Sequence, residues 1–156
     1  MAGKSDFLEN KFIDWFFRAQ AAGITGASAG AGTGPASLYV ALLTGAPSDA
    51  GGGTEPTGVG SYARVQVVSS LTAWAGTQGA GTTTASTGTG GTTSNNAAIT
   101  FPSPTADWGV CTHLGVYDAA AAGNLLYWVE LTVHKTINNG DAAPSFAAGA
   151  LTATED

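Results

Sequence analysis

Between residues 37 and 154 the chain alternates short apolar runs with segments rich in Gly, Pro, Asn and Asp. Short runs of β-branched and aromatic residues that are bounded by turn residues are typical of β-strands. No helical periodicity recurs between the runs, so the strands are expected to pair with one another in antiparallel sheets. The pattern therefore predicts an all-β fold, an antiparallel β-sandwich or jelly-roll-like domain.

The expected strands share this pattern and lie at 37–44, 62–70, 97–103, 111–118, 124–135 and 144–154. The fourth and fifth of them flank "AAAAG", which predicts a hairpin with Gly123 at positive φ. The dipeptide Asn139-Gly140 predicts a tight turn. The segment at 45–60 is rich in turn residues and is expected to be a long loop.

The N-terminal sequence "SDFLENKFIDWFFRAQAAG", residues 5–23, predicts one amphipathic helix that is capped by Ser5 or Asp6. Its apolar residues cover an arc of roughly 200°, whereas a surface helix needs a stripe of about 100° or a little more. We infer two partners for this arc, the domain of the same chain and another subunit. Asp14 and Arg18 lie four residues apart and are expected to pair on the exposed side of the helix.

Some of the helix's apolar side chains are assigned to packing within the chain's own domain: Leu8, Phe12 and Trp15. The candidate interface residues, on the helix and beyond it, are Ile13, Phe16, Phe17, Arg64 and Trp74. Arg64 is the lone charge within its strand. We expect it either to pair with a carboxylate, for which Glu130 is a candidate, or to face an interface.

The length of 156 residues suits one main domain. We predict an N-terminal helical arm at 1–22, a flexible linker at 23–37 and a β-sandwich domain at 38–156. Within this domain, the low-complexity segment 76–96 has no charge and no large apolar side chain. Such a segment has little to bury, so it is expected to be an exposed loop, or a β-arm that orders only against a neighbour.

Charged residues make up only 10% of the chain, against about 25% in ordinary globular proteins. The net charge is −6 and the five basic residues are scattered, which argues against a nucleic-acid surface. No window approaches the roughly 18 apolar residues of a membrane span, so we expect no membrane partner. A surface so poor in charge has little to keep identical molecules apart, which favours a homo-oligomer packed against neighbours.

The stretch 107–133 carries the residue types that could perform chemistry: Asp107, Cys111, His113, Asp118 and Glu130. Strand alternation places Cys111 and His113 on one side, but no cysteine-enzyme signature surrounds them. We expect a buried thiol, a hydrogen-bonded histidine and solvated acids. His113 and His134 lack metal-ligand spacing, and the glycine-rich stretches lack a phosphate-binding motif. The sequence thus predicts no enzyme, no cofactor and no metal site.

Four motifs stand out: "GVGSYAR" at 58–64, "AAITFP" at 97–102, "DWGVCTHLGVYDAAAAGNLLYW" at 107–128 and "PSFAAGALT" at 144–152. They resemble the small virion structural proteins of tailed bacteriophages, which carry labels such as tail-fibre-like or capsid decoration protein. The resemblance spans nearly the whole chain and implies a β-sandwich protein that binds other virion proteins. It implies no active site.

Two placements in the virion follow from this resemblance. The first is a capsid cement or decoration protein, which would bind the major capsid protein as a homotrimer, because small size, low charge and flexible arms suit a protein that wraps over neighbours. The alternative is a tail or tail-fibre component bound to tail proteins. For either placement we expect assembly in the host cytoplasm. A more distant alternative is a carbohydrate-binding β-sandwich module whose exposed Trp74 and Trp108 stack on sugar rings.

Overall fold

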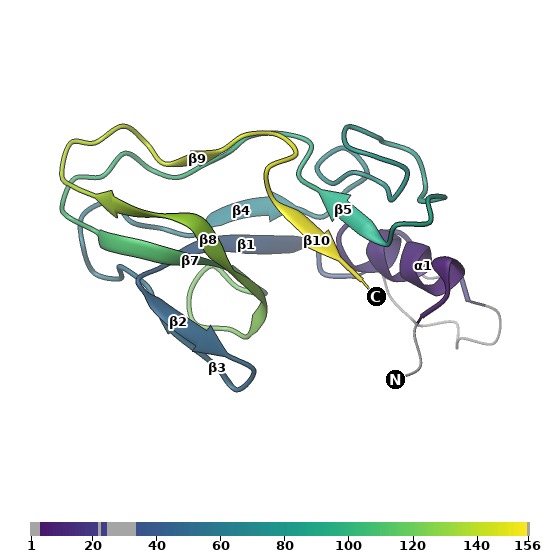
Figure 1. Ribbon diagram of the computed structural model, residues 1–156, viewed down its shortest axis with the longest axis horizontal. Helices are drawn as coiled ribbons and strands as arrows, with labels where there is room; N and C mark the ends of the chain where they lie inside the picture. Colours follow the sequence, from purple (N-terminus) through teal and green to yellow (C-terminus); the bar gives the residue numbers. More distant parts are fainter. Residues whose placement is uncertain (1–3, 22, 25–33, 156) are drawn as a thin grey trace. The chain divides into compact units, whose positions relative to one another are not determined.

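The computed structural model describes residues 4–21, 23–24 and 34–155. The chain divides into two compact units, one of Met1–Ser37, Val68–Ile99 and Phe146–Asp156, the other of Leu38–Val67 and Thr100–Ser145. Strands predominate, they pair antiparallel, and α1 is the one helix among the described residues (Figure 1). The predicted all-β, sandwich-like class with one N-terminal helix is confirmed.

The second unit is built on a four-stranded sheet in the order β4-β1-β7-β8. Its strands are β4 (Val65–Val68), β1 (Ser37–Leu43), β7 (Gly109–Tyr117) and β8 (Leu125–Ile137). All but the end residues Ser37 and Val68 belong to this unit. The central strand β1 is an almost continuous apolar run, as expected for a strand that is covered on both faces. Its leucines and valine are buried and supply much of the unit's core.

The hairpin of β7 and β8 forms as the sequence predicts. His113 lies opposite Glu130, and Gly115 lies opposite Trp128. Gly123 in the connecting loop has a φ of +73°, the left-handed conformation that was expected of it. The register fixes which side chains of the two strands share a face of the sheet.

The segment at 45–60, which was expected to be a loop, contains the ribbon of β2 (Gly45–Ser48) and β3 (Gly51–Thr54). The ribbon could not be predicted from the sequence, because β3 consists of Gly-Gly-Gly-Thr and has no alternation of apolar and polar residues. The three glycines of β3 have φ values of +82° to +90°, which other residues rarely adopt. Backbone hydrogen bonds, such as Thr44 N to Thr54 O at 2.7 Å, hold the ribbon in place of side-chain burial.

In the first unit, α1 (Asp6–Phe16) follows its cap residue Ser5, whose Oγ accepts a hydrogen bond from Leu8 N at 3.5 Å. Of the two predicted caps, Ser5 is therefore the one used. The helix is shorter than the predicted 5–23 and ends at its cap residue Phe17. Ala19 then takes a φ of +52°, a left-handed conformation that is incompatible with continuing the helix.

The first unit also contains β5 (Thr92–Ser94), which pairs antiparallel with β10 (Thr152–Thr154) (Figure 1). The loop that precedes β5 differs from the expected exposed segment, because it packs on α1 of its own unit. Asn10 Nδ2 donates to Gly88 O at 3.0 Å, and Thr77 Oγ1 donates to Asn10 Oδ1. A segment without large apolar side chains can be ordered in this way because each buried polar group finds a partner.

Two short strands complete the fold, β6 (Ile99–Thr100) and β9 (Ser145–Phe146), which pair in a two-stranded sheet. The predicted closing strand at 144–154 is therefore divided into β9 and β10, and Gly149 between them has a φ of +77°. Parts of the predicted arm and linker, residues 1–3, 22 and 25–33, lie outside the described residues. The domain boundaries drawn from the sequence stay predictions.

Candidate functional site

The acids at the two ends of β7 are engaged in turns. Asp107, which precedes β7, accepts a hydrogen bond from Asn139 N at 2.8 Å. Asp118, which follows β7, accepts hydrogen bonds from Asn124 N and Nδ2, both at 2.7 Å. These hydrogen bonds lower the pKa of Asp118 below its ordinary value. Both exposed carboxylates thus hold turns of the second unit.

Cys111 and His113 lie on the same side of β7, as the alternation predicts, opposite Lys135 and Glu130 of β8. Cys111 is fully buried, and burial raises the pKa of its thiol to about 11. The thiol is therefore protonated at neutral pH. His113 is also buried, and its Nδ1 lies 2.8 Å from Thr112 Oγ1. The prediction of a buried thiol and a hydrogen-bonded histidine is confirmed.

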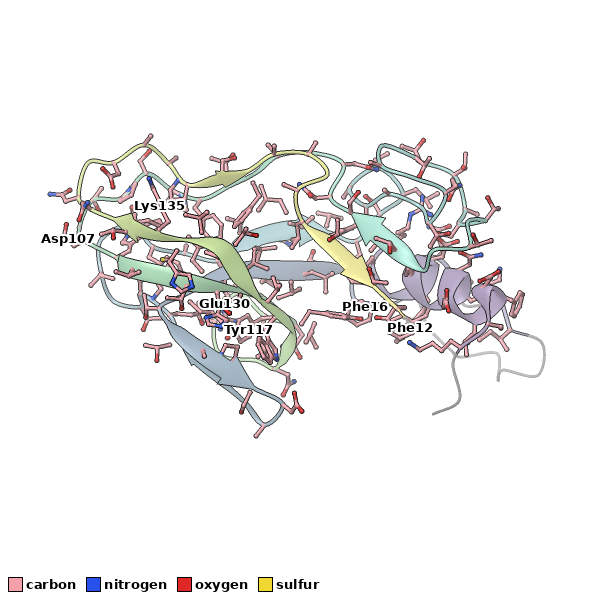
Figure 2. All side chains as sticks on the ribbon, viewed as in Figure 1. Phe12, Phe16, Asp107, Tyr117, Glu130 and Lys135 are labelled. Carbon is pink, nitrogen blue, oxygen red and sulfur yellow. The ribbon has the colours of Figure 1, made fainter. Side chains whose placement is uncertain are left out.

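Glu130 is exposed on β8, and its Oε1 lies 3.0 Å from Nε2 of His134. In a regular strand, residues four apart are separated by about 13 Å. The contact is possible because β8 has extra residues at a register shift opposite Thr112. Figure 2 shows Asp107 and Glu130 well apart along the sheet. Among the residues that the structure describes, no three His, Cys, Asp or Glu side chains gather in a metal-binding group.

Arg64, directly before β4, pairs with Glu55. Its Nη2 lies 2.5 Å from Glu55 Oε1, and its Nε donates to Oε2 at 3.0 Å. The guanidinium carbon lies 3.5 Å from the centre of the Tyr117 ring. The sequence prediction of a carboxylate partner is correct in kind, but the candidate Glu130 was wrong. Glu55 was overlooked because it follows β3, in the segment 45–60 that was expected to be a loop.

The other half of the guanidinium holds the loop between β7 and β8. Arg64 Nη1 donates to Ala119 O at 2.7 Å and to Ala122 O at 2.8 Å. Burial works to lower the pKa of Arg64, but the hydrogen bonds and charge of Glu55 raise it above its usual value. Tyr62 donates to Glu55 Oε2 at 2.9 Å, and burial, reinforced by the Glu55 charge, raises the pKa of Tyr62. The cluster therefore ties three segments of the second unit together.

A pocket of about 260 Å³ borders this cluster, and its wall includes Glu55, Thr57, Arg64 and the methyl groups of Ala120–Ala122. The two charged groups in the wall already neutralise each other. The rest of the wall is formed by Gly58, Tyr62 and Ala63. The assignment of Arg64 to a subunit interface stays a prediction.

The candidate interface residues of the first unit divide into a core group and a surface residue. Ile13, Phe17 and Trp74 are 1% exposed or less, and the Phe17 and Trp74 ring centroids lie 5.1 Å apart. Phe16 is half-buried, and its ring stacks on Phe12 with centroids 5.5 Å apart (Figure 2). The first three residues form part of the unit's own core. A role between subunits stays a prediction for all of them.

Arg18 is the buried centre of the first unit. Its Nη1 lies 2.6 Å from Asp14 Oδ1, its Nε donates to Trp74 O at 3.0 Å, and its Nη2 donates to Thr84 O at 2.6 Å. Ser86 Oγ donates to Asp14 Oδ1 at 2.6 Å. The predicted pair of Asp14 and Arg18 exists, but its expected exposure was wrong. The polar loop before β5 covers the side of the helix that carries Asp14. Its Thr84 and Ser86 supply the hydrogen-bond partners that water would otherwise provide.

The carbohydrate-binding alternative required Trp74 and Trp108 on an outer face. Both are buried, at 1% and 3% exposed. The Trp108 ring packs edge-on against Tyr62, with centroids 5.2 Å apart. Neither indole presents a face on which a sugar ring could stack, so this alternative has no support from the positions of its residues.

The fold is thus β-rich, and the ion pairs of Arg18 with Asp14 and of Arg64 with Glu55 each form within one unit. The class is that of the small, tail-fibre-like virion structural proteins of tailed phages. The model of one family, described as "Podophage GP4 fiber I protein gp80", matches residues 3–154, and the chain belongs to this family. No curated protein matches the chain.

The family membership confirms the resemblance that the four motifs indicated. It makes the protein a component of the virion that associates with other virion components. Among the described residues, no helix has the length and apolar character that crossing a bilayer would require.

Proposed function

We propose that this protein is a tail-fibre component of a tailed phage, where it binds tail proteins. The observation that carries the proposal is the match of residues 3–154 to a family of fibre proteins. The capsid-cement placement rested on low charge, small size and flexible arms. It has less support, because the loop 76–96, one of those arms, packs on its own helix.

The proposed role is structural and does not involve catalysis. Three observations support it. The thiol of Cys111 is buried with its pKa raised to about 11, Asp107 and Asp118 accept hydrogen bonds from turn amides, and Arg18 and Arg64 each pair with a carboxylate of the chain. Self-association, with a trimer as the expected state, is part of the proposal, and light scattering of the purified protein tests it against the chain mass of 15.4 kDa.

Gold-labelled antibodies against the protein, applied to purified virions in electron microscopy, test the placement. Label confined to the tail is the expected result. Label spread over the capsid surface would contradict the tail-fibre proposal and favour a cement protein. Virions of a phage that lacks the gene are the matched control for the specificity of the label.

A further inference from the structure

Helix α1 buries two acidic side chains as well as the apolar Ile13, which an ordinary surface helix does not do. Its inward side includes two acids, Glu9 and Asp14, which are only 8% and 5% exposed. Its outward side begins with Phe7 and Leu8, which are 57% and 41% exposed. A surface helix normally buries its apolar stripe and exposes its charges. In α1, Ile13 is buried as this rule expects, but the carboxylates of Glu9 and Asp14 are buried too, and Phe7 and Leu8 point outward.

The loop before β5 fixes this orientation. Asn10 and Asp14 on the helix are hydrogen-bonded to Gly88 and to Ser86 N and Oγ on the loop. This loop offers carbonyl, amide and hydroxyl groups but no large apolar side chains, so it pairs with the polar side of the helix. Rotating α1 to bury Phe7 would break these partly buried hydrogen bonds, each worth about 1 kcal/mol.

The outward face has the spacing of a helix that binds in a groove. Leu8 and Phe12 lie four residues apart, as do Phe7 and Lys11, so the four side chains form two adjacent rows on one face. Phe7 and Leu8 are exposed in these rows, and Lys11 and Phe12 are partly buried. Lys11 Nζ lies 5.7 Å from the centre of the Phe7 ring. Figure 2 shows Phe12 on α1 beside Phe16, on whose ring it stacks. Apolar anchors one turn apart are the pattern by which helices dock in apolar grooves.

We propose that this face of α1, made by Phe7, Leu8, Lys11 and Phe12, docks the protein onto another virion protein. The site on the partner is an apolar groove with a carboxylate at its rim, which pairs with the ammonium group of Lys11. Lys11 is the one charged side chain among these four. A complementary groove is therefore apolar, with one negative charge near the position of Lys11. This inference rests on the proposed function, because it supplies the means of attachment to the tail.

The small size of the helix favours a groove on another protein as the binding site, and argues against contact with α1 of a second copy. The 11 residues of α1 span about 16 Å, and a face about 10 Å wide gives a contact of about 160 Å². A stable interface buries about 800 Å² per partner. Two such helices therefore fall far short, whereas the walls of a groove also contact both flanks of the helix and the surface beside it.

A phage that lacks the gene, complemented in the host with the full-length chain, tests the proposal. The variants are Phe7→Ser/Leu8→Ser and Lys11→Glu, and the control is Val133→Ser, which changes an apolar side chain that is 75% exposed on β8. Copies per purified virion are counted by quantitative mass spectrometry. We expect the double variant to reduce incorporation by about tenfold or more, and Lys11→Glu by a smaller factor, because it sets two carboxylates against each other.

The melting temperatures of the purified variants are expected to match that of the wild type, since the changed side chains lie at the surface. Wild-type incorporation of both α1 variants would overturn the inference, as would an equal loss with Val133→Ser. If the double variant folds poorly, Lys11→Glu alone decides. Failure of the proposed function is a separate result, in which the wild-type protein itself labels the capsid and not the tail.

Discussion

Each of the two units contains an arginine whose side chain is 6% exposed or less and which holds a loop in the same way. In the first unit Arg18 pairs with Asp14, and in the second Arg64 pairs with Glu55. In both cases the guanidinium also donates to two backbone carbonyls of the unit. The planar guanidinium suits this task because it can serve a carboxylate on one side and carbonyls on the other.

The two arginines differ in what else holds the unit together. Arg64 lies beside a four-stranded sheet with an apolar core, stacks on Tyr117 and borders a pocket. Arg18 is fully buried, and its guanidinium contacts Asp14 of α1, the carbonyl of Trp74 and a loop that has no large apolar side chain of its own. The contrast indicates that a polar, glycine-rich segment can be ordered around a buried cation. We therefore expect the stability of the first unit to depend on Arg18 more than that of the second unit depends on Arg64.

Replacement of Arg18 is therefore expected to have the largest effect. Arg18→Met removes the partner of the buried Asp14 and leaves Thr84 O without its donor. Breaking one half of a buried ion pair costs about 3–5 kcal/mol of unfolding free energy. Urea unfolding followed by circular dichroism measures the loss. The double variant Asp14→Leu/Arg18→Met should recover part of it, since no charge is then left unpaired, and equal stability of the two variants would refute this account.

The matching change in the second unit should cost less. Arg64→Met leaves Glu55 unpaired, but the adjoining pocket gives that carboxylate access to water, so we expect a loss of about 2–3 kcal/mol. Hydrogen exchange should also quicken in the loop of Ala119–Ala122. Glu130→Gln is the control, because this exposed acid is not the partner of Arg64. A loss from Glu130→Gln as large as that from Arg64→Met would contradict the assignment.

The two units also differ in how far the sequence predicts them. The apolar runs of β1, β7 and β8 and the turn at Gly123 are local signals, and they correctly predict the second unit's sheet. The ribbon β2–β3 and the ordered loop before β5 depend on backbone hydrogen bonds and on glycine, which leave no apolar pattern in the sequence.

The buried charges show the same limit. The sequence predicts the i,i+4 pair of Asp14 and Arg18, but its burial depends on a loop some 70 residues away in the chain. The partner of Arg64 could not be chosen from the sequence because Glu55 sits among turn residues with no strand pattern. Composition alone predicts such segments as loops, because it reflects how much apolar surface they can bury. It does not reflect the hydrogen bonds that they can form.

A third test uses pH to examine the apolar sheet core of the second unit. Burial raises the pKa of Cys111 from 9.0 to about 11. Between these values the unfolded chain releases the thiol proton and the folded chain keeps it, so stability falls as the pH rises. This pKa shift lowers the free energy of unfolding by at most about 2–3 kcal/mol at high pH. Unfolding free energies measured from pH 8 to 11 should fall more steeply for the wild type than for Cys111→Ala, and equal slopes would contradict a buried thiol.

The smallest expected effect is that of Ser86→Ala, which tests whether a hydroxyl group stabilises the first unit together with Arg18. Ser86 Oγ donates to Asp14 Oδ1 at 2.6 Å and accepts a hydrogen bond from Arg18 Nη1 at 3.1 Å. Ser86→Ala should cost about 1–2 kcal/mol, because it removes a hydroxyl that serves both partners of the ion pair. Thr83→Ala, at an exposed position of the same loop, is the control and should change stability by less than about 0.5 kcal/mol. If the two variants unfold at the same urea concentration, the Ser86 hydroxyl adds nothing to the ion pair, and the first unit depends on Arg18 more than its hydrogen bonds indicate.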